Sequence, residues 1–141
     1  MEKGFLHIGA DTDGTTVSDD VGFGKAAAAK KSHYIGKRSL SLPENVRSDR
    51  LQLIGLTGEG AAPFPVGRRL LLPKSMQATD GWITSAGCLS TDARPVAMAV
   101  LRAGRGRLNQ RVAVYDNGRV VSCAQVSAPM FYDPSGARMH A

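Results

Sequence analysis

The stretch RVAVYDNGRVVSCAQV, residues 111–126, carries the strongest local signal for the fold. Two strand-like runs, RVAVY and GRVVSCAQV, flank the tripeptide Asp116-Asn117-Gly118. An Asn-Gly pair supplies the positive backbone φ angles that a two-residue turn between antiparallel strands requires. We therefore predict a β-hairpin here.

Four more segments of the same kind precede this hairpin. They are RLQLIGL (50–56), RRLLLP (68–73), GWITSA (81–86) and RPVAMAVLR (94–102). The apolar parity of the first segment shifts midway, as a β-bulge would cause. Six short strands separated by Gly/Pro-containing turns predict a mainly β fold, either a small antiparallel barrel or a sandwich.

The N-terminal third of the sequence has a different residue pattern, which includes helical segments. Residues 1–10 alternate as a strand does, and the stretch TVSDD then offers capping and acidic side chains for a helix N-terminus. The following VGFGKAAAAKK predicts a helix because of its four alanines. A second, shorter helix is indicated at 36–42, and the proline-containing segment 43–49 reads as a joint before the strands.

Composition indicates an ordinary globular protein. Hydrophobic residues make up 43% and charged residues 21% of 141 residues, with a net charge of +6. No apolar run approaches the roughly 20 residues that span a bilayer, and residues 1–10 do not resemble a secretory signal. We expect no membrane association and a soluble cytoplasmic protein, or an organellar one after processing in a eukaryote.

The sequence contains no common catalytic or metal-binding motif. Cys88 and Cys123 lie in no metal-ligand spacing and are interpreted as reduced, buried structural thiols, with a disulfide as the alternative. His7, His33 and His140 show no zinc-binding spacing, so no metal site is predicted. No catalytic residue is predicted either.

The basic run RAGRGRLNQR (102–111) is the one concentration of charge that could contact RNA. It lacks interleaved aromatic residues for base stacking, so a solvated loop between strands is favoured and nucleic acid is not expected as a partner.

Several stretches, in order along the chain, resemble the glycine-cleavage T-protein (aminomethyltransferase) family. The motifs are EKGF with GADTDGTT, SHYIGKRSL, RLQLIGL, GWITSAGCLS and MFYDPSGARMHA. Within that family the likeness is greatest to the C-terminal part of the sarcosine oxidase α-subunit branch. It runs from Glu2 to Arg138.

The resemblance implies a division of the chain. Residues 1–46 would be the C-terminal part of the folate-binding middle lobe, with a strand and a helix. Residues 47–141 would form the T-protein-type C-terminal β-barrel. The Phe5–Ile8 strand would then lack its neighbours, so we expect it to be disordered, paired with another copy in a homo-oligomer, or folded back on the barrel.

The resemblance also implies tetrahydrofolate as the cofactor and three residues that contact it. Glu2 takes the position of the glutamate that accepts hydrogen bonds from the pterin ring, and its alternative role is a terminal charge. Lys30, or Lys31 beside it, would meet the folate carboxylate tail, although lysine gives a point charge where T-proteins have arginine, and a solvated helix end is the alternative. Tyr132 would face folate or pack against the barrel.

The activity implied is oxidative demethylation of sarcosine with one-carbon transfer to tetrahydrofolate. Flavin and NAD would bind only in regions or partner subunits outside this chain, so the isolated chain is expected to be inactive. Partners would be other subunits or the missing N-terminal region of the enzyme. The alternatives are an aminomethyltransferase proper, or a non-enzymatic binding module that uses the loop 102–111.

Overall fold

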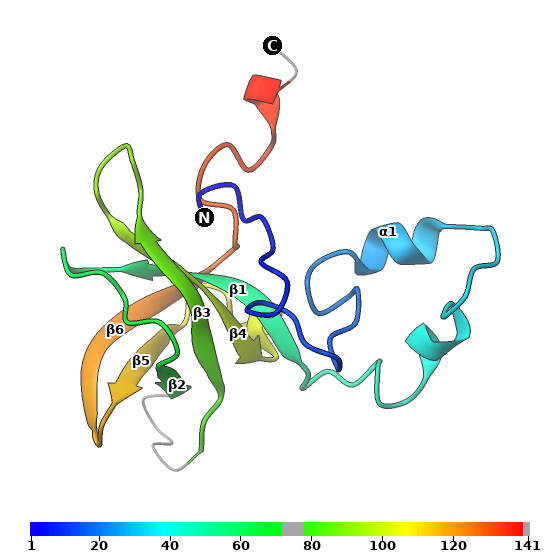
Figure 1. The fold of residues 1–141 in the computed structure, drawn as a ribbon, viewed down its shortest axis with the longest axis horizontal. Helices are drawn as coiled ribbons and strands as arrows, with labels where there is room; N and C mark the ends of the chain where they lie inside the picture. Colours follow the sequence, from blue (N-terminus) through cyan, green and yellow to red (C-terminus); the bar gives the residue numbers. More distant parts are fainter. Residues whose placement is uncertain (72–77, 140–141) are drawn as a thin grey trace.

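The barrel predicted from the sequence is confirmed. The computed structural model describes residues 1–71 and 78–139. Its six strands are β1 (Leu51–Gly58), β2 (Arg69–Leu71), β3 (Gly81–Cys88), β4 (Pro95–Arg102), β5 (Arg111–Asp116) and β6 (Arg119–Ser127). They close into an antiparallel barrel in the order β1-β4-β3-β2-β5-β6 (Figure 1). The end of the predicted strand at 68–73 lies outside the described residues.

The hairpin that joins β5 and β6 has the predicted turn. Asn117 and Gly118 have φ angles of 46° and 85°. Both are positive, as a type I′ turn requires, and Asp116 pairs with Arg119 across it.

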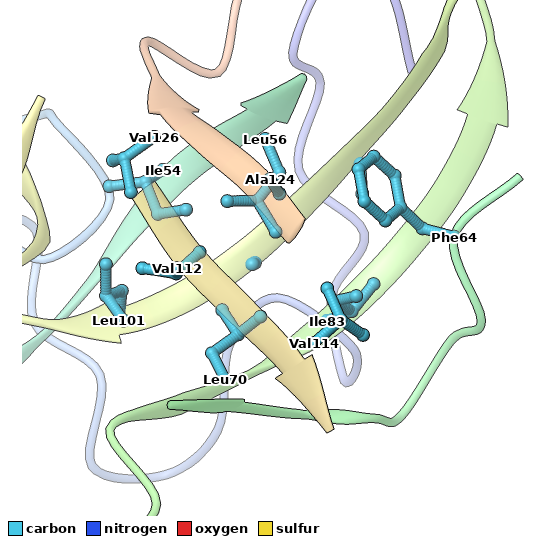
Figure 2. Packing of buried hydrophobic residues seen from close by; sticks show 12 residues of the cluster. Ile54, Leu56, Phe64, Leu70, Ile83, Leu101, Val112, Val114, Ala124 and Val126 are labelled. Atoms are coloured by element: carbon cyan, nitrogen blue, oxygen red, sulfur yellow. The ribbon is translucent and has the colours of Figure 1, made fainter. Parts of the chain in front are cut away.

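The barrel interior is apolar. Side chains from all six strands, together with Phe64, point inward and exclude water (Figure 2). Along β4, Ala97, Ala99 and Leu101 face this core and are fully buried. Small alanines opposite larger Leu, Ile and Val side chains allow a barrel this narrow to be filled without a channel.

The outer face of β1 and β4 is also buried, because both ends of the chain cover it. Leu53, Met98 and Val100 form a second apolar cluster, against which Met1, Leu6, Val21, Leu51 and Phe131 pack. Gly55 faces this layer, where a Cβ atom would lie 2.3 Å from the carbonyl oxygen of Ala128. The outer layer therefore depends on the absence of a side chain at this position.

The bulge predicted in RLQLIGL is wrong, and this second apolar layer explains the sequence pattern instead. The pairing of β1 with β4 runs without a register shift from Leu51 opposite Arg102 to Thr57 opposite Val96. Apolar residues fill both parities because β1 is buried on both faces. The irregular positions lie elsewhere, between Ile83 and Ser85 in β3 and in β6 opposite Val114 and Tyr115.

The strand predicted at residues 1–10 is wrong. This segment forms turns, with one isolated bridge between Ile8 and Thr12. The segment folds back on the barrel, one of the three expected outcomes, because Met1 and Leu6 gain apolar contacts there. The strand edge that would have paired copies in a homo-oligomer is therefore not formed.

The predicted helix is present but short. It is α1 (Gly24–Ala29), and single 3₁₀ turns follow at Arg38–Ser41, Gly104–Arg107 and Ala137–Met139. The helix and the chain up to residue 46 project to one side of the barrel (Figure 1). The division of the chain into domains at residue 46 stays a prediction. Among the described residues, no helix has the length and apolar character needed to cross a bilayer.

Candidate functional site

The two ends of the chain meet, and this brings Glu2 next to Tyr132. The Glu2 carbonyl oxygen accepts hydrogen bonds from the backbone N–H groups of Phe131, at 2.9 Å, and Tyr132, at 3.1 Å. The N-terminal segment and the segment leading to the C-terminus run side by side in Figure 1. Two of the three residues predicted from the sequence to bind folate thus share one corner of the molecule.

The Glu2 carboxylate is held by Ser90, in the loop between β3 and β4. Its Oε1 atom accepts hydrogen bonds from the Ser90 hydroxyl at 2.6 Å and from the Ser90 backbone N–H at 2.5 Å. These two bonds, the hydroxyl first, lower the pKa of Glu2 below its ordinary value. Sequence reasoning missed Ser90, although it is the last residue of the GWITSAGCLS motif.

The Tyr132 ring lies between two cations. The Lys3 ammonium is 5.4 Å and the Arg138 guanidinium 5.2 Å from the ring centroid, and Arg138 also hydrogen-bonds the Tyr132 hydroxyl. Lys3 makes an ion pair of 3.2 Å with Asp133. The Tyr132 ring and its two cations therefore lie on the segment that bonds the Glu2 backbone, while the Glu2 carboxylate is bound to Ser90.

Lys30 lies elsewhere. It follows α1 in the part of the chain that projects from the barrel, away from the termini (Figure 1). Its ammonium group sits 5.2 Å from the centroid of the Tyr34 ring. The structure therefore does not bring Lys30 together with Glu2 and Tyr132.

Two of the family-like motifs meet in a buried polar contact. Asp11, from GADTDGTT, is 2% exposed, and its carboxylate accepts hydrogen bonds from the Thr84 hydroxyl and, at 2.7 Å, from the backbone N–H of His7. Thr84 belongs to the GWITSA strand and is itself buried. The contact fastens the N-terminal segment to the outer face of β3, so both motif residues have a structural role.

A second polar anchor joins the same segment to the start of β1. Arg50 and Asp20 form a bidentate ion pair, with Nε to Oδ1 at 2.9 Å and Nη2 to Oδ2 at 2.6 Å. Asp20 is 4% exposed, and its backbone carbonyl accepts a hydrogen bond from the Leu53 N–H. Between this segment and the barrel lies a cleft of about 470 Å³, with Trp82 on its wall. Glu2, Lys30 and Tyr132 do not line it.

The arginine-rich loop is not an open cationic surface. Each of its four arginines lies in an ion pair with a carboxylate of this chain: Arg102 with Asp49, Arg105 with Asp19, Arg107 with Asp80, and Arg111 with Glu59. Paired guanidinium groups attract phosphates less, so the geometry agrees with the solvated loop favoured by the sequence.

The two cysteines form no disulfide in the described residues, but both are exposed, so the expectation of burial is wrong. They lie at the end of β3 and on β6, where the side chains face solvent. Within residues 1–71 and 78–139, no three His, Cys, Asp or Glu side chains gather into a group that could hold a metal ion.

No protein-family model matches the chain. Three curated relatives do, all of them sarcosine oxidase alpha subunits. Those of Corynebacterium sp. strains U-96 and P-1 are each 32% identical to the chain over 97% of its length. That of Rhizobium meliloti strain 1021 is 30% identical over 99%. The chain spans about 15% of the length of each relative. It is therefore related, over nearly all of its length, to a part of the sarcosine oxidase alpha subunit, as its motifs predict.

Proposed function

We propose that the chain acts as the barrel portion of a sarcosine oxidase of the alpha-subunit type and contributes to a reduced-folate site. The observation that carries the proposal is the similarity to sarcosine oxidase alpha subunits together with the corner formed by Glu2 and Tyr132. Its partners would be the other regions or subunits of that enzyme.

The chemistry of the corner suits a pterin. A pterin ring presents an amino group beside a ring N–H, and an ionised carboxylate can accept both hydrogen bonds with charge assistance. Both bonds from Ser90 end on Glu2 Oε1, and no hydrogen bond to Oε2 occurs within the described residues. Glu2 is partly exposed, and its lowered pKa keeps the carboxylate ionised at neutral pH. The aromatic ring of Tyr132 belongs to the segment whose backbone bonds the Glu2 carbonyl.

The role of these residues would be to bind and orient. Tetrahydrofolate, when bound, supplies an acceptor for the one-carbon unit that sarcosine oxidation releases. Holding that acceptor in a fixed position favours its reaction over escape of the unit to water. Lys30 is not near this corner, so a contact with the folate tail would need a ligand that reaches the projecting segment.

Isothermal titration with tetrahydrofolate under anaerobic conditions tests the site. We expect weak saturable binding that Glu2→Ala weakens about 10- to 150-fold, the equivalent of the roughly 1.5–3 kcal/mol of a hydrogen bond to a charged group. Ser90→Ala should weaken it much less, because it keeps the carboxylate. Glu59→Ala removes a carboxylate paired with Arg111 and should have no effect. Absence of saturable binding, or equal effects of the two glutamate variants, would refute the folate site.

The purified chain alone should not oxidise sarcosine. Oxidation of an amine needs a two-electron acceptor such as a flavin, which we place in other parts of the enzyme. An assay for hydrogen peroxide and formaldehyde checks this, and sustained turnover by a flavin-free sample would show that the proposal is wrong.

A further inference from the structure

The positive charge of the chain is concentrated in the segment that projects from the barrel. Residues 21–43 contain five cations, Lys25, Lys30, Lys31, Lys37 and Arg38, and no Asp or Glu. They therefore account for +5 of the net charge of +6. We call residues 21–46 the basic lobe; this range also includes Glu44, whose carboxylate is paired with Arg47.

In the part of the chain that the structure describes, none of the five cations of the basic lobe lies in an ion pair with a carboxylate, whereas most arginines of the barrel do. Ten ion pairs occur within the described residues, and none involves a cation of the lobe. Lys37 donates hydrogen bonds to the carbonyl oxygens of Lys30, Lys31 and Ser32, which holds the chain after α1 in place. Lys25, Lys30, Lys31 and Arg38 are exposed.

The basic lobe also contains a groove with apolar walls. Its volume is about 430 Å³, and it lies between α1 and the residues around the turn Arg38–Ser41. Its apolar lining includes Ala28, Leu40 and Val46, and Val46 is 63% exposed. Polar residues also line it, among them Lys37 and Asp19, and the Asp19 carboxylate is paired with Arg105. Outside the groove, Ile35 is fully exposed and Phe23 more than half exposed. Exposed apolar surface beside positive charges that have no carboxylate partner is typical of a protein interface.

We propose that the basic lobe is a docking surface for an acidic partner polypeptide, which inserts an apolar side chain into the groove and places flanking carboxylates near the lysines. The proposal goes beyond the folate role of the barrel. A second copy of this chain fits the lobe poorly, because nine of its twelve acidic residues already lie in ion pairs. Nucleic acid is a less suitable partner, because the Tyr34 ring is held against Lys30 and Lys37 instead of being free to stack on a base. An anionic membrane is less suitable, because α1 has only six residues and is too short for an amphipathic membrane-binding helix.

The test uses synthetic peptides and the whole chain. One peptide carries a leucine between two runs of three glutamates, and its control carries serine in place of leucine. We expect the leucine peptide to bind at least about tenfold more tightly in fluorescence anisotropy, since burial of a leucine contributes about 1.5–3 kcal/mol. Raising the salt from about 50 mM to about 500 mM should weaken both peptides.

Variants locate the binding. Lys30→Glu with Lys31→Glu should reduce affinity at least about tenfold, whereas Arg69→Glu with Arg119→Glu, two exposed barrel arginines, should change it less than about twofold. Ala28→Leu fills the groove and should abolish the preference for leucine. Ala26→Leu, on the same helix but outside the groove, should not. Equal binding of the two peptides, or equal loss of affinity in the two charge-reversal pairs, would overturn the proposal. So would binding to single-stranded RNA or to phosphatidylserine vesicles that is tighter than peptide binding and is unchanged by Ala28→Leu.

Discussion

Replacement of Arg50 by methionine should lower the free energy of unfolding much more than loss of an exposed ion pair on the same short stretch does. The Arg50 side chain is 14% exposed and that of Asp20 5%, and the Arg50 guanidinium also donates to the carbonyl oxygens of Thr15, at 2.7 Å, and Glu44, at 3.2 Å. Asp20 accepts a further hydrogen bond of 2.9 Å from the Val17 N–H. In Arg50→Met the carboxylate of Asp20 stays buried and loses its charged partner.

The expected cost follows from burial. Removing one member of a buried, hydrogen-bonded pair costs about 3–5 kcal/mol, because the other charge is left without compensation. Arg47, three residues away, bonds Glu44 and Asp49, and these three side chains are 46%, 69% and 47% exposed. An exposed pair of this kind contributes about 0–1 kcal/mol, because solvent screens it. Arg47→Met is therefore the matched control.

Two measurements check the argument. Urea unfolding followed by circular dichroism should show a loss of about 3–5 kcal/mol for Arg50→Met and less than about 1 kcal/mol for Arg47→Met. Hydrogen exchange at the Leu53 amide, which donates to the Asp20 carbonyl, should speed up only in Arg50→Met. Adding Asp20→Asn to Arg50→Met should recover part of the loss, because it removes the uncompensated charge. Similar losses of stability in the two arginine variants would refute the reasoning.

Three further outcomes are expected. Gly55→Ala should lower the free energy of unfolding by at least about 1 kcal/mol in urea titrations, because its Cβ meets backbone of the outer layer, whereas Gly60→Ala meets nothing within 4 Å and should be nearly neutral. Thr84→Val leaves a buried aspartate without its hydroxyl donor and should cost about 1–3 kcal/mol in the same assay; an unchanged midpoint would contradict the buried contact. The pKa of the Glu2 carboxyl is lowered from 4.5 by its hydrogen bonds from Ser90, which we call the tether. The stability that the tether contributes is therefore fully present above pH 4.5 and is lost as the pH falls through the lower pKa of the folded state. The Ser90 amide proton shift in an NMR titration should follow this transition and become pH-independent in Glu2→Gln, and a midpoint at or above 4.5 would count against the tether.

Local pattern determined much of the barrel. The six strand segments lie where alternation and turn residues indicated them, and the Asn117-Gly118 turn forms as its backbone preferences require. A strand and a tight turn depend on neighbouring residues, so the sequence reports them directly. The motifs along the chain also indicated the relationship to sarcosine oxidase alpha subunits.

Tertiary structure decided how the outer face of the barrel is covered. The sequence shows that Leu53 is apolar, but it does not show which distant segment packs on it. The uneven apolar parity of RLQLIGL therefore predicted a bulge that the structure does not contain. For the same reason the strand predicted at residues 1–10 failed. Met1 and Leu6 pack on the barrel surface, where no neighbouring strand offers hydrogen bonds to the segment, whereas Phe5 and Ile8 stay exposed.

The candidate site shows the same division between local pattern and long-range contact. The sequence alone named Glu2 and Tyr132, but their meeting needs both ends of the chain to lie on one face, and Ser90 to come from a loop 88 positions away. Lys30 was assigned to the same site by its place after a helix, and the direction in which that helix projects carries it to the basic lobe instead. Such contacts between distant segments depend on how the whole chain closes, which no local pattern of residues encodes.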